Sequence, residues 1–306
     1  MQNRQLYGVA FIVCAAMLWG TTGTAQSFAT LSTSSYWIGT ARLIVAAGFF
    51  ALWISIADRH TLTRGHLKTL PWRFILTAAL SMCAYNLMFF AGVRQAGVAL
   101  GAALAIGSGP VWAGLIEGLW YRRMPSKAWW LAVAVAVSGL IMASWESFSS
   151  PNGLIGSMPN GLALAGPVLC VLSGLAYALY AIVTRQAVSV APAGAITAMT
   201  FTAAAVFAVP VAYVLAGTPA FLVTDIPVML WLGVVATGVA YLLFSFGLRE
   251  VSSATAVALA LVEPITAVVL AIVIVGEQPG AQGLLGMLIV LIGLVLIVRA
   301  ERANSL

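Results

Sequence analysis

The chain has 306 residues, of which 62% are hydrophobic and only 7% are charged. A soluble domain usually has about a quarter of its residues charged and about half apolar, and a soluble globule of this size could not keep so much apolar surface out of water. Soluble enzymes, nucleic-acid binders and disordered chains are therefore excluded. The net charge of +6 does not indicate nucleic acid, because the basic residues stand at the ends of apolar runs, where they set membrane topology.

Apolar runs separated by turn-forming residues predict an all-α membrane protein. A spanning helix needs about 20 apolar residues, and the composition provides for about ten of them. The first run is expected to be retained rather than cleaved as a signal peptide, because it is long and lacks a clear cleavage site. We expect helices over residues 6–26, 35–57, 72–93, 98–121, 127–145, 161–184, 193–215, 227–248, 253–275 and 280–299.

The distribution of lysine and arginine predicts that both termini face the cytoplasm. With that orientation, twelve basic residues lie at cytoplasmic helix ends, Arg94 alone lies at the opposite end, and Arg42 lies within the second helix. The segment 146–160, rich in Ser, Gly and Pro, is then an external linker between two halves, 1–150 and 151–306. The twelve cytoplasmic residues are Arg4, Arg59, Arg64, Lys68, Arg73, Arg122, Arg123, Lys127, Arg185, Arg249, Arg299 and Arg302.

A weak internal repeat relates the two halves. The string AYNLMFFAGVRQ (84–95) is similar to AYLLFSFGLRE (240–250), and an offset of 154 residues superposes Pro110 on Pro264 and Gly139 on Gly293. Each half has five helices, an odd number, so the two copies must insert in opposite directions. Inverted repeats of this kind are typical of secondary transporters, whose substrate site lies near the membrane midplane between the halves.

With these repeats, the sequence resembles the drug/metabolite transporter superfamily, in its ten-helix EamA-type branch. The matching pieces are MLWGTTGTA (17–25), TARLIVAAGFFAL (40–52), the block 94–125 and its copy LVEPITAVVLAIVIVGEQPGAQGLLGMLIVLIGLVLI (261–297). The fourth helix departs from the family, because it ends in Arg122 and Arg123 where the family usually has an acidic GE pair. Within the branch the chain is similar to YddG-like exporters of aromatic and neutral amino acids, which implies export of a small metabolite.

Polar side chains on six of the helices form stripes at helical spacing. Polar groups in lipid are costly and usually face the bundle interior or a watery cavity. Hydrogen bonds between helices are the alternative role for each serine, whereas aromatic residues in mid-membrane are as well explained by ligand contact. The candidate substrate-binding residues are Trp19, Tyr85, Asn86, Ser108, Trp112, Ser173, Tyr177, Tyr180 and Tyr241. Such a lining favours a zwitterion with an apolar or planar side chain over a phosphorylated ligand.

Three charged residues lie within predicted helices. An unpaired arginine there is expensive, so Arg42 should meet a carboxylate, backbone carbonyl groups or cavity water, with a substrate carboxylate as the alternative. Glu117 is close enough to the cytoplasmic end to reach Arg122 or water. Glu263 directly precedes Pro264, so it either caps backbone groups that the proline frees or binds and releases a proton during transport.

The sequence has no recognisable catalytic motif, and its three cysteines lie in apolar runs without metal-ligand spacing. We therefore expect a transporter and not an enzyme, with no metal and no cofactor. The expected function is export of aromatic and other neutral amino acids by alternating access across a bacterial inner membrane. Its expected partners are the substrate and the lipid bilayer but no nucleic acid, with a monomer as the working oligomeric state. Export of another small metabolite or drug, a channel and an intramembrane enzyme remain the alternatives.

Overall fold

The computed structural model describes residues 2–26, 28, 34–57, 68–122, 124–145, 165–219, 223–276 and 280–304. The predicted linker 146–160, the two histidines and several loop arginines lie outside these ranges. The described helical segments, in chain order, are α1 (Gln2–Gln26), α2 (Ser35–Ala57), α4 (Trp72–Ala96), α5 (Val98–Tyr121), α6 (Lys127–Ala143), α8 (Ala165–Val188), α9 (Ala193–Ala216), the 3-10 turn η3 (Val223–Asp225), α10 (Ile226–Leu230), the π-helical segment η4 (Trp231–Val239), α11 (Ala240–Gly247), α12 (Ser253–Leu259), α13 (Val262–Leu270), the π-helical segment η5 (Ala271–Val275) and α14 (Ala281–Asn304).

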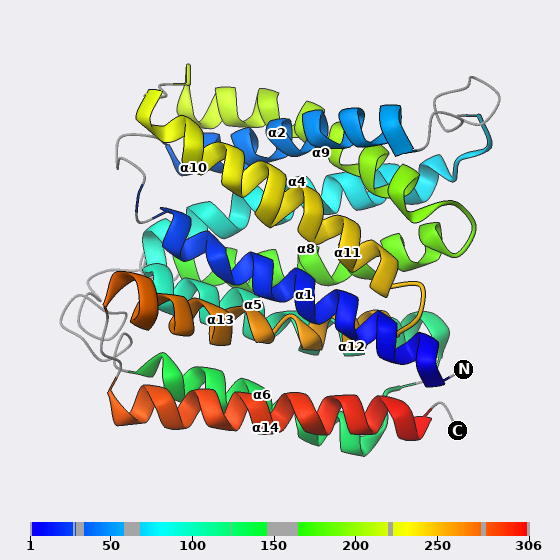
Figure 1. Cartoon of the computed structure of the whole chain (residues 1–306), viewed down its shortest axis with the longest axis vertical. Helices are drawn as coiled ribbons and strands as arrows, with labels where there is room; N and C mark the ends of the chain where they lie inside the picture. Colours follow the sequence, from blue (N-terminus) through cyan, green and yellow to red (C-terminus); the bar gives the residue numbers. More distant parts are fainter. Residues whose placement is uncertain are drawn as a thin grey trace.

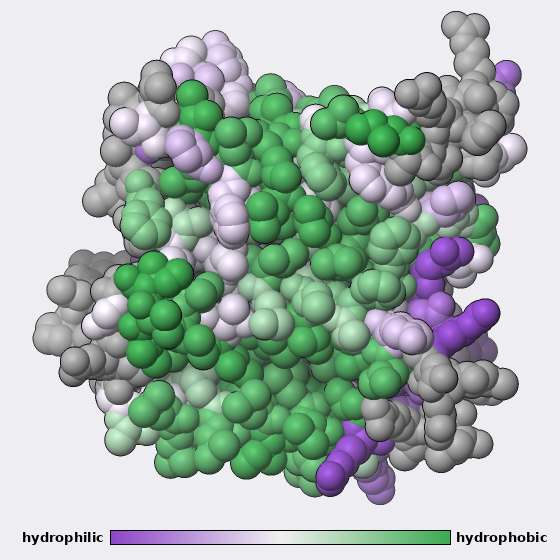
Figure 2. Space-filling view, in the orientation of Figure 1, coloured by the Kyte–Doolittle hydropathy of each residue, from purple (hydrophilic) through white to green (hydrophobic). Residues whose placement is uncertain are grey.

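These segments confirm the predicted all-α membrane fold. Counting α10–η4–α11 and α12–α13–η5 as single spans, nine helical units in the described ranges are long and apolar enough to cross a membrane, and the shorter α6 is the tenth apolar helix. In lipid every backbone polar group must find a partner within the protein, which helices provide internally. The side chains that face the lipid are apolar as well. Figure 2 shows that hydrophobic residues form a continuous area across the middle of one face of the molecule.

Local sequence signals explain where several helices begin and end. Ser126 accepts a hydrogen bond from the Trp129 N–H and so caps the N-terminus of α6, because the first N–H groups of a helix have no partner within it. Between α4 and α5 the chain turns at Gly97 alone, whose φ of 87° suits glycine. Arg122, at a φ of 55°, ends α5 in the left-handed conformation.

The contacts between helices repeat when the two halves are exchanged. Helix α4 packs on α8 as α11 packs on α1, and α5 packs on α8 as α13 packs on α1. Two pairs of repeat-related helices, α2 with α9 and α6 with α14, pack directly on each other. In the second pair the backbones approach closely, because a Cβ atom added at Gly139 would lie 2.7 Å from the Gly286 carbonyl oxygen. The fold therefore has the two-repeat arrangement that the sequence predicts.

Both chain termini lie at the same end of the bundle, on the right of Figure 1. Hydrophilic residues gather along this edge in Figure 2. An even number of spanning helices requires this placement of the termini, and the hydrophilic residues at this edge agree with a polar, membrane-external end of the bundle. We call this the terminal end of the bundle, and the other the distal end.

Two of the ten predicted helices are interrupted, which the sequence analysis did not anticipate. The predicted helix 227–248 contains the π-helical segment η4 in its middle. The predicted helix 253–275 is broken at Ala260 and Leu261, between α12 and α13. The cause of the break is Pro264, which has no N–H to give to the Ala260 carbonyl oxygen; the Glu263 N–H donates to it instead, at 2.9 Å. Broken helices near the midplane are a feature of transporter binding sites.

Candidate functional site

A cluster of aromatic side chains fills the centre of the bundle. Trp19 of α1 lies 5.9 Å from Tyr177 and 4.8 Å from Tyr241 between ring centroids, and Tyr180 lies 5.6 Å from Tyr241. Tyr85 joins the same cluster at 5.3 Å from Tyr177. Five of the nine candidate substrate-binding residues, from α1, α4, α8 and α11, therefore meet in one place between the two halves. We call these five, with Phe201 and Phe244, the aromatic cluster.

The aromatic cluster is closely packed and leaves three polar atoms without partners in the described part of the chain. Tyr180 is 0% exposed and Tyr241 is 2% exposed, so neither ring faces an open space. The Trp19 indole nitrogen and the hydroxyl groups of Tyr177 and Tyr180 are buried, and none of them forms a hydrogen bond with a described residue. A buried donor without a partner costs about 1–3 kcal/mol. These three groups therefore have hydrogen-bonding capacity that no described residue uses.

The other four candidates are placed differently. Ser108 and Ser173 donate to carbonyl oxygens on their own helices, at 3.3 and 2.7 Å. The Asn86 amide donates to the Met82 carbonyl oxygen at 3.0 Å, while its own carbonyl oxygen is buried without a hydrogen bond to a described residue. Trp112 is partly buried and packs against the apolar core. Of these four, Asn86 retains a polar atom with no partner in the described part of the chain.

A cavity of about 470 Å³ lies on the distal side of the aromatic cluster. It is formed by the distal parts of α1, α4, α5 and α6 together with α13, η5 and α14, and Trp19 belongs to both the cavity and the cluster. The volume is within the range of small-molecule binding sites. Its lining comprises Trp19, Gly20, Thr22, Gly23, Thr24, Phe89, Phe90, Val93, Ala102, Ala103, Ile106, Leu140, Ala143, Ser144, Glu263, Pro264, Ala267, Val268, Ala271 and Met287.

Glu263 is the one charged side chain among the described residues that line this cavity. It stands in the first turn of α13, directly after the helix break. Its carboxyl group forms no hydrogen bond or salt bridge with another described residue, so it does not cap the backbone groups near Pro264. The N-terminal end of a helix favours a negative charge, and the charge of Arg42 also acts on this carboxyl group. Glu263 therefore presents a carboxyl group to the cavity.

Arg42 is buried beside the cavity and is held by the π-helical segment. Its Nε donates to the Thr237 hydroxyl oxygen at 2.8 Å, and its Nη2 donates to the Ala236 carbonyl oxygen at 3.4 Å. The guanidinium carbon also lies 5.8 Å from the centre of the Phe90 ring. Thr237 in turn donates to the Leu232 carbonyl oxygen at 2.6 Å. The arginine thus meets a backbone carbonyl and a hydroxyl group, which offsets the cost of its burial.

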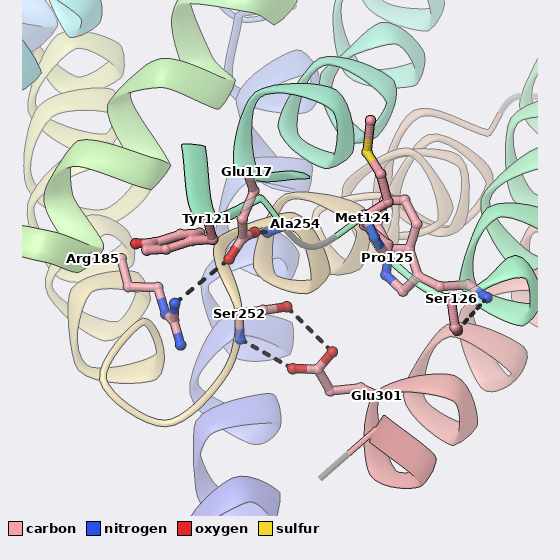
Figure 3. Close-up of a pocket in the computed structure, with 10 residues that line it drawn as sticks. Glu117, Tyr121, Met124, Pro125, Ser126, Arg185, Ser252, Ala254 and Glu301 are labelled. Atoms are coloured by element: carbon pink, nitrogen blue, oxygen red, sulfur yellow. Dashed lines mark hydrogen bonds and ion pairs between the residues drawn. The ribbon is translucent and has the colours of Figure 1, made fainter. Parts of the chain in front are cut away.

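A second, polar pocket of about 570 Å³ lies at the terminal end (Figure 3). Glu117 of α5 accepts a hydrogen bond from the Ala254 N–H at the start of α12 and forms a salt bridge of 3.5 Å with Arg185 of α8. The sequence analysis expected Glu117 to reach Arg122 or water, and its salt bridge is instead with Arg185. Glu301 of α14 accepts from the N–H and the hydroxyl group of Ser252, at 3.1 and 3.2 Å.

These contacts make the terminal pocket a junction of four helices. Arg185 also donates from Nε to the Val251 carbonyl oxygen at 2.9 Å, which ties α8 to the turn before α12. Glu301 accepts a third hydrogen bond, from Thr255, at 2.7 Å. Both carboxyl groups of this pocket therefore have partners within the protein. The terminal pocket and the distal cavity share no lining residue.

The sequence analysis missed the phenylalanines of the site. Phe201 and Phe244 belong to the aromatic cluster, at 4.8 Å from Tyr241 and 5.3 Å from Trp19, and Phe89 and Phe90 line the cavity. The candidate residues were chosen because their side chains carry polar atoms within apolar runs, and phenylalanine has no polar side-chain atom. The spacing of three residues between Tyr241 and Phe244 places both on one face of a helix and was the available signal. The fifth and tenth helices were also not expected to line a cavity, yet α6 and α14 do so.

Comparisons with known proteins agree on a family. The family model described as the EamA-like transporter family matches the chain twice, at residues 6–145 and 164–299. A Bacillus subtilis (strain 168) protein described as the uncharacterized transporter YwfM is 31% identical over 297 residues, which cover 96% of this chain and 95% of that protein. An uncharacterized transporter of Clostridium kluyveri is 25% identical over 180 residues, 58% of this chain and 56% of its own. One crystal structure has the same fold, with a TM-score of 0.79, 14% identity and 100% of both chains covered.

Proposed function

Because the chain belongs to the EamA-like transporter family, we propose that this multi-pass membrane transporter exports aromatic and other neutral, hydrophobic amino acids by alternating access. The observation that carries the proposal is the distal cavity, which combines apolar and aromatic walls with a single carboxyl group. A nucleotide or a phosphorylated sugar calls for clustered Lys or Arg, and the described lining has neither. A zwitterion with an apolar side chain suits these walls.

The aromatic cluster is the proposed barrier that the substrate passes. It joins rings from both halves, such as Trp19 and Tyr85 from the first and Tyr177 and Tyr241 from the second. Each ring contact contributes about 0.5–1.5 kcal/mol, so the contacts can be exchanged one by one for contacts with an aromatic substrate. The unpaired Trp19 nitrogen and Tyr177 hydroxyl group supply hydrogen bonds along the way.

The residues proposed to contact the substrate are the nine of the sequence analysis and four added by the structure. We assign direct contact in the cavity to Trp19, with its neighbours Phe89 and Phe90. Contact during passage is assigned to the remaining residues of the aromatic cluster and its surroundings: Tyr85, Asn86, Ser108, Trp112, Ser173, Tyr177, Tyr180, Phe201, Tyr241 and Phe244.

The proposed orientation places the terminal end in the cytoplasm of a bacterial inner membrane. The sequence analysis assigns twelve of the fourteen basic residues to that end, and the positive-inside rule then places it in the cytoplasm. The bacterial source of the matched relatives supports this location. The distal cavity then faces the outside, and substrate leaves the protein through it.

Reconstitution tests this proposal. Purified protein in liposomes loaded with unlabelled phenylalanine should accumulate external labelled phenylalanine by saturable counterflow, and tryptophan and leucine should compete whereas aspartate should not. Trp19→Ala should reduce the initial rate about tenfold, since it removes a wall of the cavity and a member of the cluster. The matched control is Trp120→Ala, because Trp120 is 55% exposed on the outer face of α5.

The proposal predicts an unchanged rate for this control. Absence of counterflow with every amino acid of the panel would refute the substrate assignment. Unitary currents in planar bilayers would instead indicate a channel. A rate unaltered by Trp19→Ala would remove this residue from the path.

A further inference from the structure

The described lining of the distal cavity has an acidic side chain but no basic side chain. Glu263 brings one carboxyl group, and no basic side chain is found among the described lining residues. Arg42 lies nearby, but its guanidinium group is occupied by Thr237, by Ala236 and by the face of Phe90. A carboxylate in an apolar environment is costly unless it is paired. A cation that enters the cavity would supply such a partner.

The walls next to Glu263 suit an organic cation. Trp19 and Phe89 line the same cavity, and the face of an aromatic ring attracts an ammonium group, most strongly when the ring is tryptophan. Phe90 already stacks with Arg42 at 5.8 Å, so a cation in the cavity would contact those parts of Trp19 and Phe89 that line it. A carboxylate together with aromatic faces is how proteins recognise an amine attached to an apolar body.

The cavity holds no matching group for the other end of an amino acid. The substrate carboxylate would meet hydroxyl groups, such as those of Thr22 and Ser144, but no described cationic side chain of the lining. Recognition therefore depends on the ammonium group much more than on the carboxylate. A ligand that keeps the ammonium group and the aromatic ring but has no carboxylate should still fit.

We propose that the Glu263 carboxylate and the Trp19 and Phe89 rings form an ammonium site, and that arylalkylamines are a second class of ligand for this transporter. This inference deepens the proposed function, because it concerns the same cavity. It differs from it in a measurable way, since it predicts binding of amines that are not amino acids.

Binding to the purified full-length protein in detergent tests the ammonium site. The probes are 2-phenylethylamine and 3-phenylpropionate, which present an ammonium and a carboxylate group on similar bodies. Calorimetry should detect saturable binding of 2-phenylethylamine and at least tenfold weaker binding of 3-phenylpropionate. This comparison needs no variant. Equal affinity for the two probes, or tighter binding of 3-phenylpropionate, would overturn the inference.

A variant series then locates the site. Glu263→Gln keeps the shape of the side chain and removes its charge, so it should weaken 2-phenylethylamine binding about tenfold or more, whereas Glu263→Asp should retain part of the affinity. Glu250→Gln is the control, because Glu250 is exposed outside the cavity. Wild-type affinity in Glu263→Gln would overturn the assignment to Glu263.

The two proposals can fail separately. Amine binding that depends on Glu263, without phenylalanine counterflow, would refute amino-acid export and support the ammonium site. Phenylalanine counterflow with no binding of 2-phenylethylamine would support export and refute the ammonium site.

Discussion

Helix α5 and its repeat copy α12–α13 each carry a proline and a glutamate, and the two copies use them differently. Helix α5 continues through Pro110 as one element, and its Glu117 lies close to the terminal end. The copy is broken before Pro264, and its Glu263 lies at the break in the middle of the bundle. The fourth helix of the repeat is thus continuous in the first half, whereas in the second half it is broken and lies beside a cavity.

The carboxyl groups of Glu117 and Glu263 differ in their bonding partners. Glu117 has partners on two other helices, Ala254 and Arg185, so its charge stabilises the packing of the terminal end. Glu263 has no bonding partner among the described residues and faces the cavity. A buried charge with protein partners supports the structure, whereas a charge that faces a cavity without them is available to a ligand. The two copies of the repeat therefore hold their carboxyl groups in different surroundings, and we propose a binding role only for that of Glu263.

The first prediction concerns a variant that places a carboxyl group in the first repeat, at the position equivalent to Glu263. Gly109 corresponds to Glu263 by the offset of 154 residues, and a Cβ atom there would already lie 3.2 Å from Val257. Gly109→Glu would bury an unpaired charge at a tightly packed position, so we expect a loss of several kcal/mol in stability and a smaller monodisperse fraction in size-exclusion chromatography.

Gly109→Ala is the matched control for this transfer. It adds only the Cβ atom, so Val257 has to shift slightly and folded yield should remain near that of the wild type. If Gly109→Glu gave a wild-type yield of folded protein, the two repeat positions would be equally able to hold a carboxyl group, and the comparison would fail.

The second prediction concerns the arginine that lies beside the cavity. Arg42→Ala removes the charged donor of two hydrogen bonds, to Thr237 and Ala236, and we expect a loss of about 1.5–3 kcal/mol in stability. Arg42→Lys should be intermediate, because an ammonium group cannot reproduce the planar donor arrangement. Thermal unfolding in detergent measures both. Unchanged unfolding temperatures in both variants would show that the contacts with the π-helical segment contribute nothing to stability.

The amino-acid sequence was sufficient to predict the fold. Apolar runs, basic residues at their ends and the 154-residue repeat gave the ten helices, most of them within four residues of the observed ends. The break at Ala260 and Leu261 was not predicted, although Pro264 was its visible cause. Proline also stands within α5 at Pro110 without breaking it, so the residue type alone does not decide. The sequence of one helix does not show which of its prolines will break it, because neighbouring helices and local adjustments can satisfy the freed backbone groups.

The sequence analysis singled out several residues that the structure brings together, and their role in binding stays a prediction. Tyrosines and tryptophans in mid-membrane were singled out because they combine rings with polar atoms, and five of them meet in the aromatic cluster. The cavity itself could not be predicted, because it depends on where six helices leave space between them. Ser108 and Ser173 illustrate the limit of polar stripes, since both hydroxyl groups bond to carbonyl groups on their own helices.

The matched pair Glu117→Gln and Glu263→Gln tests the division of roles most directly. Both substitutions remove one charge from repeat-related helices without changing side-chain size, and thermal unfolding is recorded with and without 2-phenylethylamine. Glu117→Gln should lose about 1–3 kcal/mol of stability because it weakens the contacts with Ala254 and Arg185, yet it should still be stabilised by the amine. Glu263→Gln should unfold at or above the wild-type temperature and lose the stabilisation by the amine. Equal destabilisation by the two substitutions, with the response to the amine retained in both, would contradict this account.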